Sequence, residues 1–158
     1  MLLEIKENPD PILRKKTAKI KDALAPEVQQ LILNMTETMQ KIKGVGLAAN
    51  QVGLSLRLCV IEVEKEIYTL INPKITAKSK KRFQSEEGCF SFPGIYLTVP
   101  RANEVQVRFL NKEGKPQKIK ASGLLSSALQ HEIDHLDGVL FIDRIKKPKV
   151  EKTQTQTN

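Results

Sequence analysis

The chain has 158 residues, of which 40% are hydrophobic and 28% are charged, a balance that excludes wholesale disorder. This length fits one domain with its own core, and we expect that domain over residues 1–145, followed by a basic, polar and disordered tail over residues 146–158. The net charge of +8 favours polyanionic neighbours but says nothing about chemistry.

The first residues, Met1 to Lys6, become polar at once and lack the apolar run of a signal peptide. No stretch of the sequence is long and apolar enough to span a bilayer. We therefore expect a cytoplasmic protein without a membrane partner. In that reducing compartment Cys59 and Cys89 are not expected to form a disulfide, so each needs its own explanation.

A long amphipathic helix is predicted in the N-terminal part, from Pro26 to about Lys43. Proline suits the first turn of a helix, and Gly44 supplies a terminating residue. Apolar residues recur at helical spacing, at Val28, Leu31, Ile32, Met35, Met39 and Ile42. One face of this helix should pack on the core.

Strands are predicted next. Residues 56–63 form a nearly continuous apolar run, in which Cys59 reads as a small buried hydrophobic residue, and residues 67–71 make its partner. Residues 105–109 alternate between apolar and polar, and a turn leads to residues 117–120, which predicts an antiparallel hairpin.

The last predicted helix runs from about Ser122, a candidate cap, to Leu136, with Gly138 just past its end. Its apolar residues lie on nearly every side, as in helices inside a domain. Within it His131 and His135 are one turn apart on one face, close enough to bind one metal ion. Glu132 points away from that face and suits a base that acts on a water molecule activated by the ion. The alternative is a helix that carries two histidines by chance.

A catalytic site of this kind needs a third protein ligand. The chain has no other histidine, and Phe141 stands where one class of metallopeptidase has its third histidine. An acid or a cysteine remains. Cys89 is the better candidate because Gly88 permits a close approach beside the sulfur, and we expect Pro93 to end regular pairing there. The alternative is a cysteine packed in a loop.

A glycine-rich segment extends from Gly44 to Gln51. It has the spacing of a dinucleotide fingerprint, but it follows a helix instead of a strand, so a phosphate site is not expected. We interpret it as a strip where a substrate backbone approaches closely, with the Gln51 amide offered to a polarised oxygen. A tight loop after the helix is the simpler alternative.

Three segments in this order, residues 44–51, 87–91 and 130–135, closely resemble the three signature motifs of peptide deformylases, and the similarity covers nearly everything but the tail. The resemblance implies a metal-dependent hydrolase that removes the formyl group from the formylmethionine of nascent proteins and releases formate. It implies an α+β fold with antiparallel β-sheets packed around the buried C-terminal helix that carries His131 and His135. It also implies one divalent ion, Fe(II) in the cell, with Zn, Ni or Co in a purified sample.

On this resemblance, the metal ligands are Cys89, His131 and His135, and Glu132 is the base. Gln51 and the backbone N–H of Phe90 would stabilise the oxyanion. The resemblance also implies that Val45 and Gly46 pair with the backbone of the substrate. We expect Leu124 and Ala128 to form the walls of the methionine pocket.

Some features depart from the family. Phe90 replaces a common leucine, Tyr96 stands where some members have a peptide-binding arginine, and the long C-terminal helix of many relatives is missing. Ribosome docking would then use the basic surface. We interpret the basic clusters near residues 78–82 and 144–149 as solvated segments and expect no specific nucleic-acid site. A general metallopeptidase and a ribosome-binding module with a structural metal are the alternatives.

Overall fold

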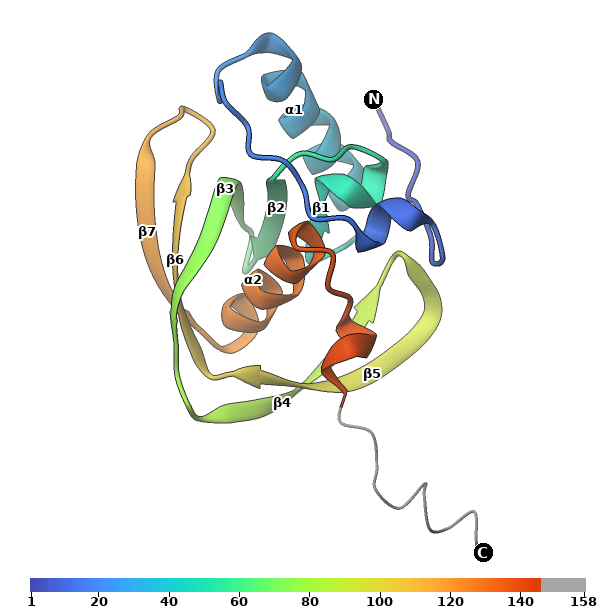
Figure 1. Ribbon diagram of the computed structural model, residues 1–158, viewed down its shortest axis with the longest axis vertical. Coiled ribbons are helices and arrows are strands. Elements are labelled where there is room, and N and C mark those ends of the chain that lie inside the picture. Colours follow the sequence, from blue (N-terminus) through green and yellow to red (C-terminus); the bar gives the residue numbers. More distant parts are fainter. Residues whose placement is uncertain (146–158) are drawn as a thin grey trace, which may run out of the picture.

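A five-stranded antiparallel sheet with the order β1-β2-β3-β6-β7 forms the centre of the structure, a computed structural model that describes residues 1–145 (Figure 1). Its strands are β1 (Gly46–Ala48), β2 (Leu58–Val63), β3 (Glu66–Lys78), β6 (Glu104–Leu110) and β7 (Pro116–Ser122). A separate two-stranded antiparallel sheet contains β4 (Arg82–Cys89) and β5 (Phe92–Ala102). The predicted tail lies outside the described residues.

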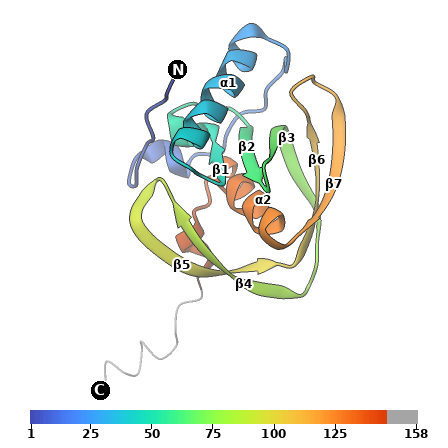
Figure 2. The same ribbon diagram turned by 180° about the vertical axis from the view of Figure 1, so that it is seen from behind.

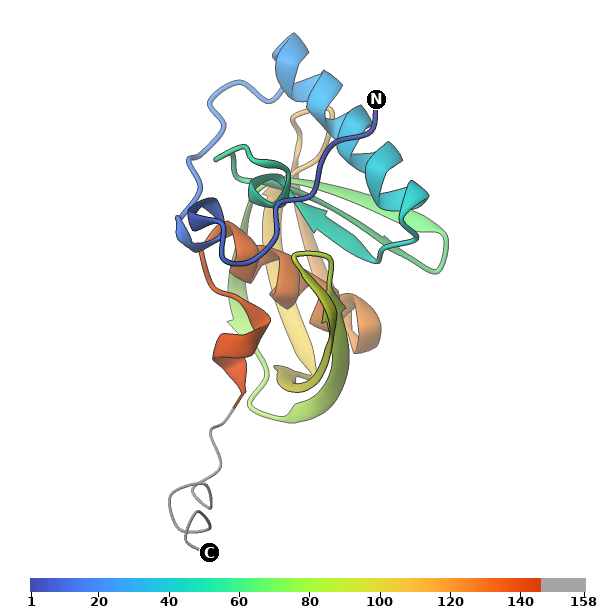
Figure 3. The same cartoon turned by 90° about the vertical axis from the view of Figure 1, so that its right-hand side faces the viewer.

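The helices α1 (Pro26–Lys41) and α2 (Gly123–Leu136) cover opposite faces of the large sheet (Figure 3). Strand β2 shows why, because successive side chains of a strand point to opposite faces. Leu58 and Val60 pack in the cluster that contains α1, whereas Cys59 and Ile61 pack with α2. A strand with helices on both faces must be apolar throughout, which explains the continuous apolar run of the sequence.

The helix α1 begins at Pro26 as predicted but ends two residues early, since the backbone leaves the helical conformation and Lys43 has a φ of 57°. The expectation of a long helix in the N-terminal part needs correction. The helix has 16 residues and begins only at residue 26, after a segment that contains the short 3-10 helix Pro11–Arg14. Its amphipathic character is confirmed by the buried face in the core.

The helix α2 matches the predicted bounds, and every residue from Ser126 to Leu136 is buried. Ser122 holds the cap position, but its side chain makes no capping hydrogen bond. Beyond the helix, Gly138 has a φ of +76°, and a Cβ there would lie 2.5 Å from the carbonyl oxygen of Arg14. Only glycine meets both conditions. Among residues 1–145, neither helix has the length and hydropathy needed to cross a bilayer.

The hairpin of β4 and β5 was not predicted, and the expectation that Pro93 ends regular pairing is wrong. Cys89 pairs with Phe92 while Gly88 pairs with Tyr96, so the residues between Phe92 and Tyr96 form an irregularity within a continuing strand. Pro93 falls in that irregularity, where no ladder N–H is required. The segment beyond Phe90 is thus part of a hairpin.

The N-terminal segment ties distant loops together. The backbone N–H of Lys6 donates to the Gln51 carbonyl at 2.7 Å, and that of Asn8 donates to the Ser91 carbonyl at 2.8 Å. Thr17 donates to the Leu136 carbonyl through both its backbone and its hydroxyl. In Figure 2 this blue segment descends beside α1 toward the tip of the β4–β5 hairpin. It therefore fixes the two loops that flank the site described below.

Candidate metal centre

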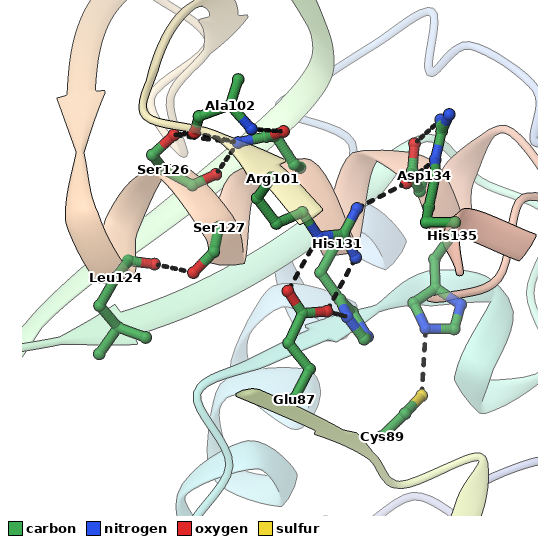
Figure 4. A network of polar contacts seen from close by, with 12 residues as sticks. Glu87, Cys89, Arg101, Ala102, Leu124, Ser126, Ser127, His131, Asp134 and His135 are labelled. Carbon is green, nitrogen blue, oxygen red and sulfur yellow. Dashed lines mark hydrogen bonds and ion pairs between the residues drawn. The ribbon is translucent and has the colours of Figure 1, made fainter. Parts of the chain in front are cut away.

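Three side chains from two elements converge at the end of β4. Cys89 is the last residue of β4, and His131 and His135 project from the same side of α2 toward it (Figure 4). Their ligand atoms all lie within 4.8 Å of one another, and Cys89 Sγ is 3.3 Å from His135 Nε2. The imidazole centroids are 5.0 Å apart, as expected for histidines one turn apart.

The donor set fits a metal ion. Donor atoms bound to one ion at about 2.0–2.3 Å lie roughly 3–4 Å apart, close to the separation of the sulfur and His135. Both imidazoles are buried, and the Nδ1 atom of His135 has no hydrogen-bond partner among the described residues. A thiolate with two imidazoles suits first-row transition ions of borderline softness. Apart from these three residues, no other group with metal-ligand geometry is found in residues 1–145.

Glu87 holds His131 from behind. Its carboxylate lies 2.8 Å from His131 Nδ1 and receives two hydrogen bonds from Arg101, each 2.8 Å (Figure 4). Burial alone would raise the pKa of Glu87, but the bonds with Arg101 and His131 outweigh it and lower the pKa to about 2. The carboxylate therefore stays ionised and leaves Nε2 of His131 as the nitrogen available to an ion.

Arg101 is the centre of a longer network. It is 2% exposed and also donates to Asp134 at 3.0 Å, and Asp134 in turn accepts two hydrogen bonds from Arg144. Burial alone would lower the pKa of Arg101, but its bonds to Glu87 and Asp134 outweigh burial and raise the pKa above its ordinary value. A buried guanidinium between two carboxylates satisfies both of them, and this arrangement fixes β4 and β5 against α2.

Glu132 lies beside the ligands in a buried position, and burial raises its pKa to about 7. Its Oε1 atom has no hydrogen-bond partner within the described residues. A Cβ on Gly46 would lie 2.6 Å from Glu132 Oε2, and one on Gly44 would lie 2.5 Å from the ring of Phe90. A side chain at either position would therefore collide with this protein's own side chains, which is a reason for glycine in addition to the expected approach of a substrate backbone.

The Gln51 amide is oriented by its surroundings. Its Oε1 accepts from the backbone N–H of Ala48 at 3.0 Å, which directs Nε2 toward Ser91 Oγ at 3.2 Å and Cys89 Sγ at 3.7 Å. Ser91 in turn donates to the carbonyl of Lys6. The amide group predicted from the sequence therefore does lie beside the sulfur.

All the residues predicted for the site except His135 line one pocket of about 540 Å³, and His135 lies behind its wall. Leu124 and Ala128 of α2 contribute to this wall, and Phe90 is partly exposed at it. Tyr96 is 81% exposed, and its ring lies against Gly88. The two departures noted in the sequence thus both border the pocket.

Sequence reasoning gave no role to Glu87, Arg101 or Asp134. Glu87 and Asp134 belong to the motifs that contain the ligands, so their positions were a usable signal. Arg101 stands outside every motif, and only the folded chain brings it between them. Cys59 is fully buried, as predicted, and burial raises the pKa of its thiol.

The family model described as polypeptide deformylase matches residues 2–151 of the chain. The chain belongs to the peptide deformylase family. The peptide deformylase of Thermodesulfovibrio yellowstonii is 47% identical over 155 residues, which cover 95% of this chain and 93% of that protein. Members of this family are hydrolases, so the chain is an enzyme of that class.

Solved peptide deformylases share the fold. The structure from Thermotoga maritima has a TM-score of 0.90 at 37% identity and covers 93% of this chain and 99% of that one. The structure from Acinetobacter baumannii, which has Met-Ala-Ser bound, has a TM-score of 0.89 at 30% identity and covers 92% of this chain and 99% of that one. The antiparallel sheets and the C-terminal helix of this chain are therefore those of the peptide deformylase fold.

Proposed function

We propose that this peptide deformylase is a metal-dependent enzyme that removes the N-formyl group from the formylmethionine of nascent proteins and releases formate. The observation that carries the proposal is the convergence of Cys89, His131 and His135 beside the buried Glu132, in a chain of this family. These three residues would hold one divalent ion, Fe(II) in the cell, with Zn, Ni or Co in a purified sample. The site would operate in the cytoplasm.

Held by Cys89, His131 and His135, a bound ion would act as a Lewis acid and would lower the pKa of a water molecule toward about 7. Glu132 accepts the proton of the attacking water and returns it to the leaving amine. Its Oε1 atom has no hydrogen-bond partner in residues 1–145 and is therefore free for this task. Gln51 Nε2 and the backbone N–H of Phe90 donate to the oxygen on which negative charge develops, and donors of this kind typically lower a barrier by about 3–4 kcal/mol each.

The substrate would enter between β1 and the β4–β5 hairpin. Strand β1 is at the edge of the large sheet, so the outer side of Val45 and Gly46 remains available for pairing with an extended peptide. The methionine side chain would then lie against Leu124 and Ala128. The Met-Ala-Ser bound by the Acinetobacter baumannii relative supports a peptide that begins with methionine. The basic surface would bring the enzyme to the ribosome.

The test is a formate-release assay on anaerobically prepared protein loaded with Fe or Ni, with formyl-Met-Ala-Ser as the substrate. We expect formate from this peptide and no cleavage of unformylated Met-Ala-Ser. Cleavage of the unformylated peptide bond would indicate a general metallopeptidase. A folded, metal-loaded sample that releases no formate would overturn the proposal, and a closed fourth coordination position would indicate a structural metal.

A further inference from the structure

A second hollow, of about 1210 Å³, lies on the other side of α2 from the substrate pocket. Ile133, Asp134 and Asp137 line it from the helix, whereas His131 and Glu132 line the substrate pocket, and no residue lines both. Strands β3, β6 and β7 supply much of its wall, and they lie side by side in Figures 1 and 2. A ligand in this hollow would leave the substrate pocket open.

Three cations form a row across these strands. Lys74 is directly opposite Arg108, and Arg108 is directly opposite Lys118. All three are exposed and line the hollow. Neighbouring strands are about 4.8 Å apart, and like charges directly opposite each other destabilise a sheet. The sheet therefore carries this row at a cost to its own stability.

No carboxylate within the described residues neutralises the row. Asp134 is bound by Arg101 and Arg144, and Asp137 is bound by Arg57. Three further cations of the hollow form no ion pair with any described residue. They are Lys16, Lys19 and Lys78.

Partial burial lowers the pKa of Lys78, against the pull of Asp134, and the charges of Arg144 and Arg82 lower it further. Its ammonium group is thus partly desolvated and has three arginines near it. An added anion would offset both effects. Among the described residues, the carboxylates that line the hollow are Asp134 and Asp137, and both are already paired with arginines.

We propose that this hollow binds the phosphate backbone of RNA without reading its sequence. The inference deepens the proposed function, on which it rests, by giving ribosome docking a defined surface and chemistry. Unpaired cations at regular intervals suit a chain of phosphates. A membrane is the poorer fit, because none of the exposed large hydrophobic residues lines the hollow, and interfacial binding needs such residues. The basic residues here are then more than solvated segments.

The test compares two triple variants of equal charge. One replaces the row by Lys74→Gln, Arg108→Gln and Lys118→Gln. The control replaces three exposed lysines outside the hollow, by Lys41→Gln, Lys65→Gln and Lys112→Gln. Fluorescence anisotropy with a labelled single-stranded RNA of mixed sequence is measured over a range of salt. Loss of three phosphate contacts should make the slope of log affinity against log salt concentration shallower by about 2. Binding at 0.1 M salt should then be about 10²-fold weaker. The control variant should stay near wild type.

A single substitution separates this role from misfolding. Arg108→Gln removes the central charge of the row, so we expect the Tm to rise while RNA affinity falls. A merely structural arginine would lower the Tm when replaced. Opposite signs in the two measurements support the proposal, and a lowered Tm contradicts it.

Other outcomes would overturn the proposal. One is an equal loss of RNA affinity in both triple variants, which would mean that only net charge matters. Another is a wild-type protein that does not bind RNA. The third is a wild-type protein that binds vesicles of anionic lipid or polyglutamate more tightly than RNA. Formate release from a short formylated peptide should be unchanged in both triple variants. A wild-type protein that binds RNA but releases no formate would contradict the proposed function and would leave the RNA-binding surface supported.

Discussion

The two sides of α2 treat charge in opposite ways. On the side of the metal centre, ionised groups are buried and held by several partners, as Glu87 is by Arg101 and His131. On the side of the basic hollow, Lys74, Arg108 and Lys118 are exposed and enter no ion pair among the described residues. The two sides share α2, but Glu87 and Arg101 come from the separate β4–β5 sheet, whereas the three cations come from β3, β6 and β7 of the large sheet.

The difference shows what each side is built for. A reacting group must be held in one geometry, and a network with several bonds per group holds it there without movement. A surface that accepts a polymer of variable sequence needs charge at the right spacing and little else. Substitutions should therefore have large, local effects on the first side and graded, salt-dependent effects on the second.

The largest effect should follow from Glu132→Gln. This change keeps the size of the side chain and removes its ability to accept a proton, so kcat for formate release should fall by about 10²–10⁴-fold. Metal content, measured by atomic absorption, should stay at the wild-type level because Glu132 is not a ligand. Glu113→Gln, in an exposed turn, is the matched control and should leave kcat unchanged. A Glu132→Gln enzyme with normal turnover would show that another group moves the proton.

Arg101→Met tests the buried network. Removing the guanidinium leaves Glu87 and Asp134 without their shared partner, so the free energy of unfolding in urea should fall by about 3–5 kcal/mol. Metal affinity should weaken by about 10–100-fold, because His131 loses the support of a fixed carboxylate. Arg82→Met, at an exposed position that forms no ion pair with any described residue, should change stability by less than about 0.5 kcal/mol. Equal effects of the two substitutions would contradict the contrast between buried and exposed charge.

The smallest effect should come from Asp143→Asn, which belongs to neither side. Burial alone would raise the pKa of Asp143, but the bonds from Arg14 and from the backbone of Leu140 together outweigh it and lower the pKa. Because the folded pKa is below the ordinary value of 3.8, this carboxylate stabilises the fold above that pH, and its contribution is lost as pH falls toward the folded pKa.

The pair with Arg14 is partly exposed, so its contribution near neutral pH should be at most about 1 kcal/mol. Urea unfolding of wild type and variant at several pH values measures it. The difference should shrink below pH 3.8, and a difference that grows as pH falls would show that the carboxylate is not the stabilising form.

The proximity of the two histidines could be predicted from the sequence because their geometry is local. Four residues along a helix place His131 and His135 on one face whatever surrounds them. The hairpin of β4 and β5 could not be predicted in this way. A proline usually ends a strand, and Pro93 is accommodated here only because its strand pairs irregularly with β4. Arg101 escaped notice because its contacts join strands and a helix that are distant in sequence. A local pattern carries no trace of such contacts.

The contacts of the N-terminal segment have a consequence for the order in which the site is made during translation. The hydrogen bonds of Lys6 and Asn8 cannot form until Gln51 and Ser91 have been synthesised. Those of Thr17 require Leu136, which is synthesised 119 residues later. Cys89, the proposed third ligand, is likewise made well before either histidine. The leading segment therefore stays undocked throughout most of synthesis, the thiol of Cys89 appears in the second half, and the centre assembles in a late step, once α2 has emerged.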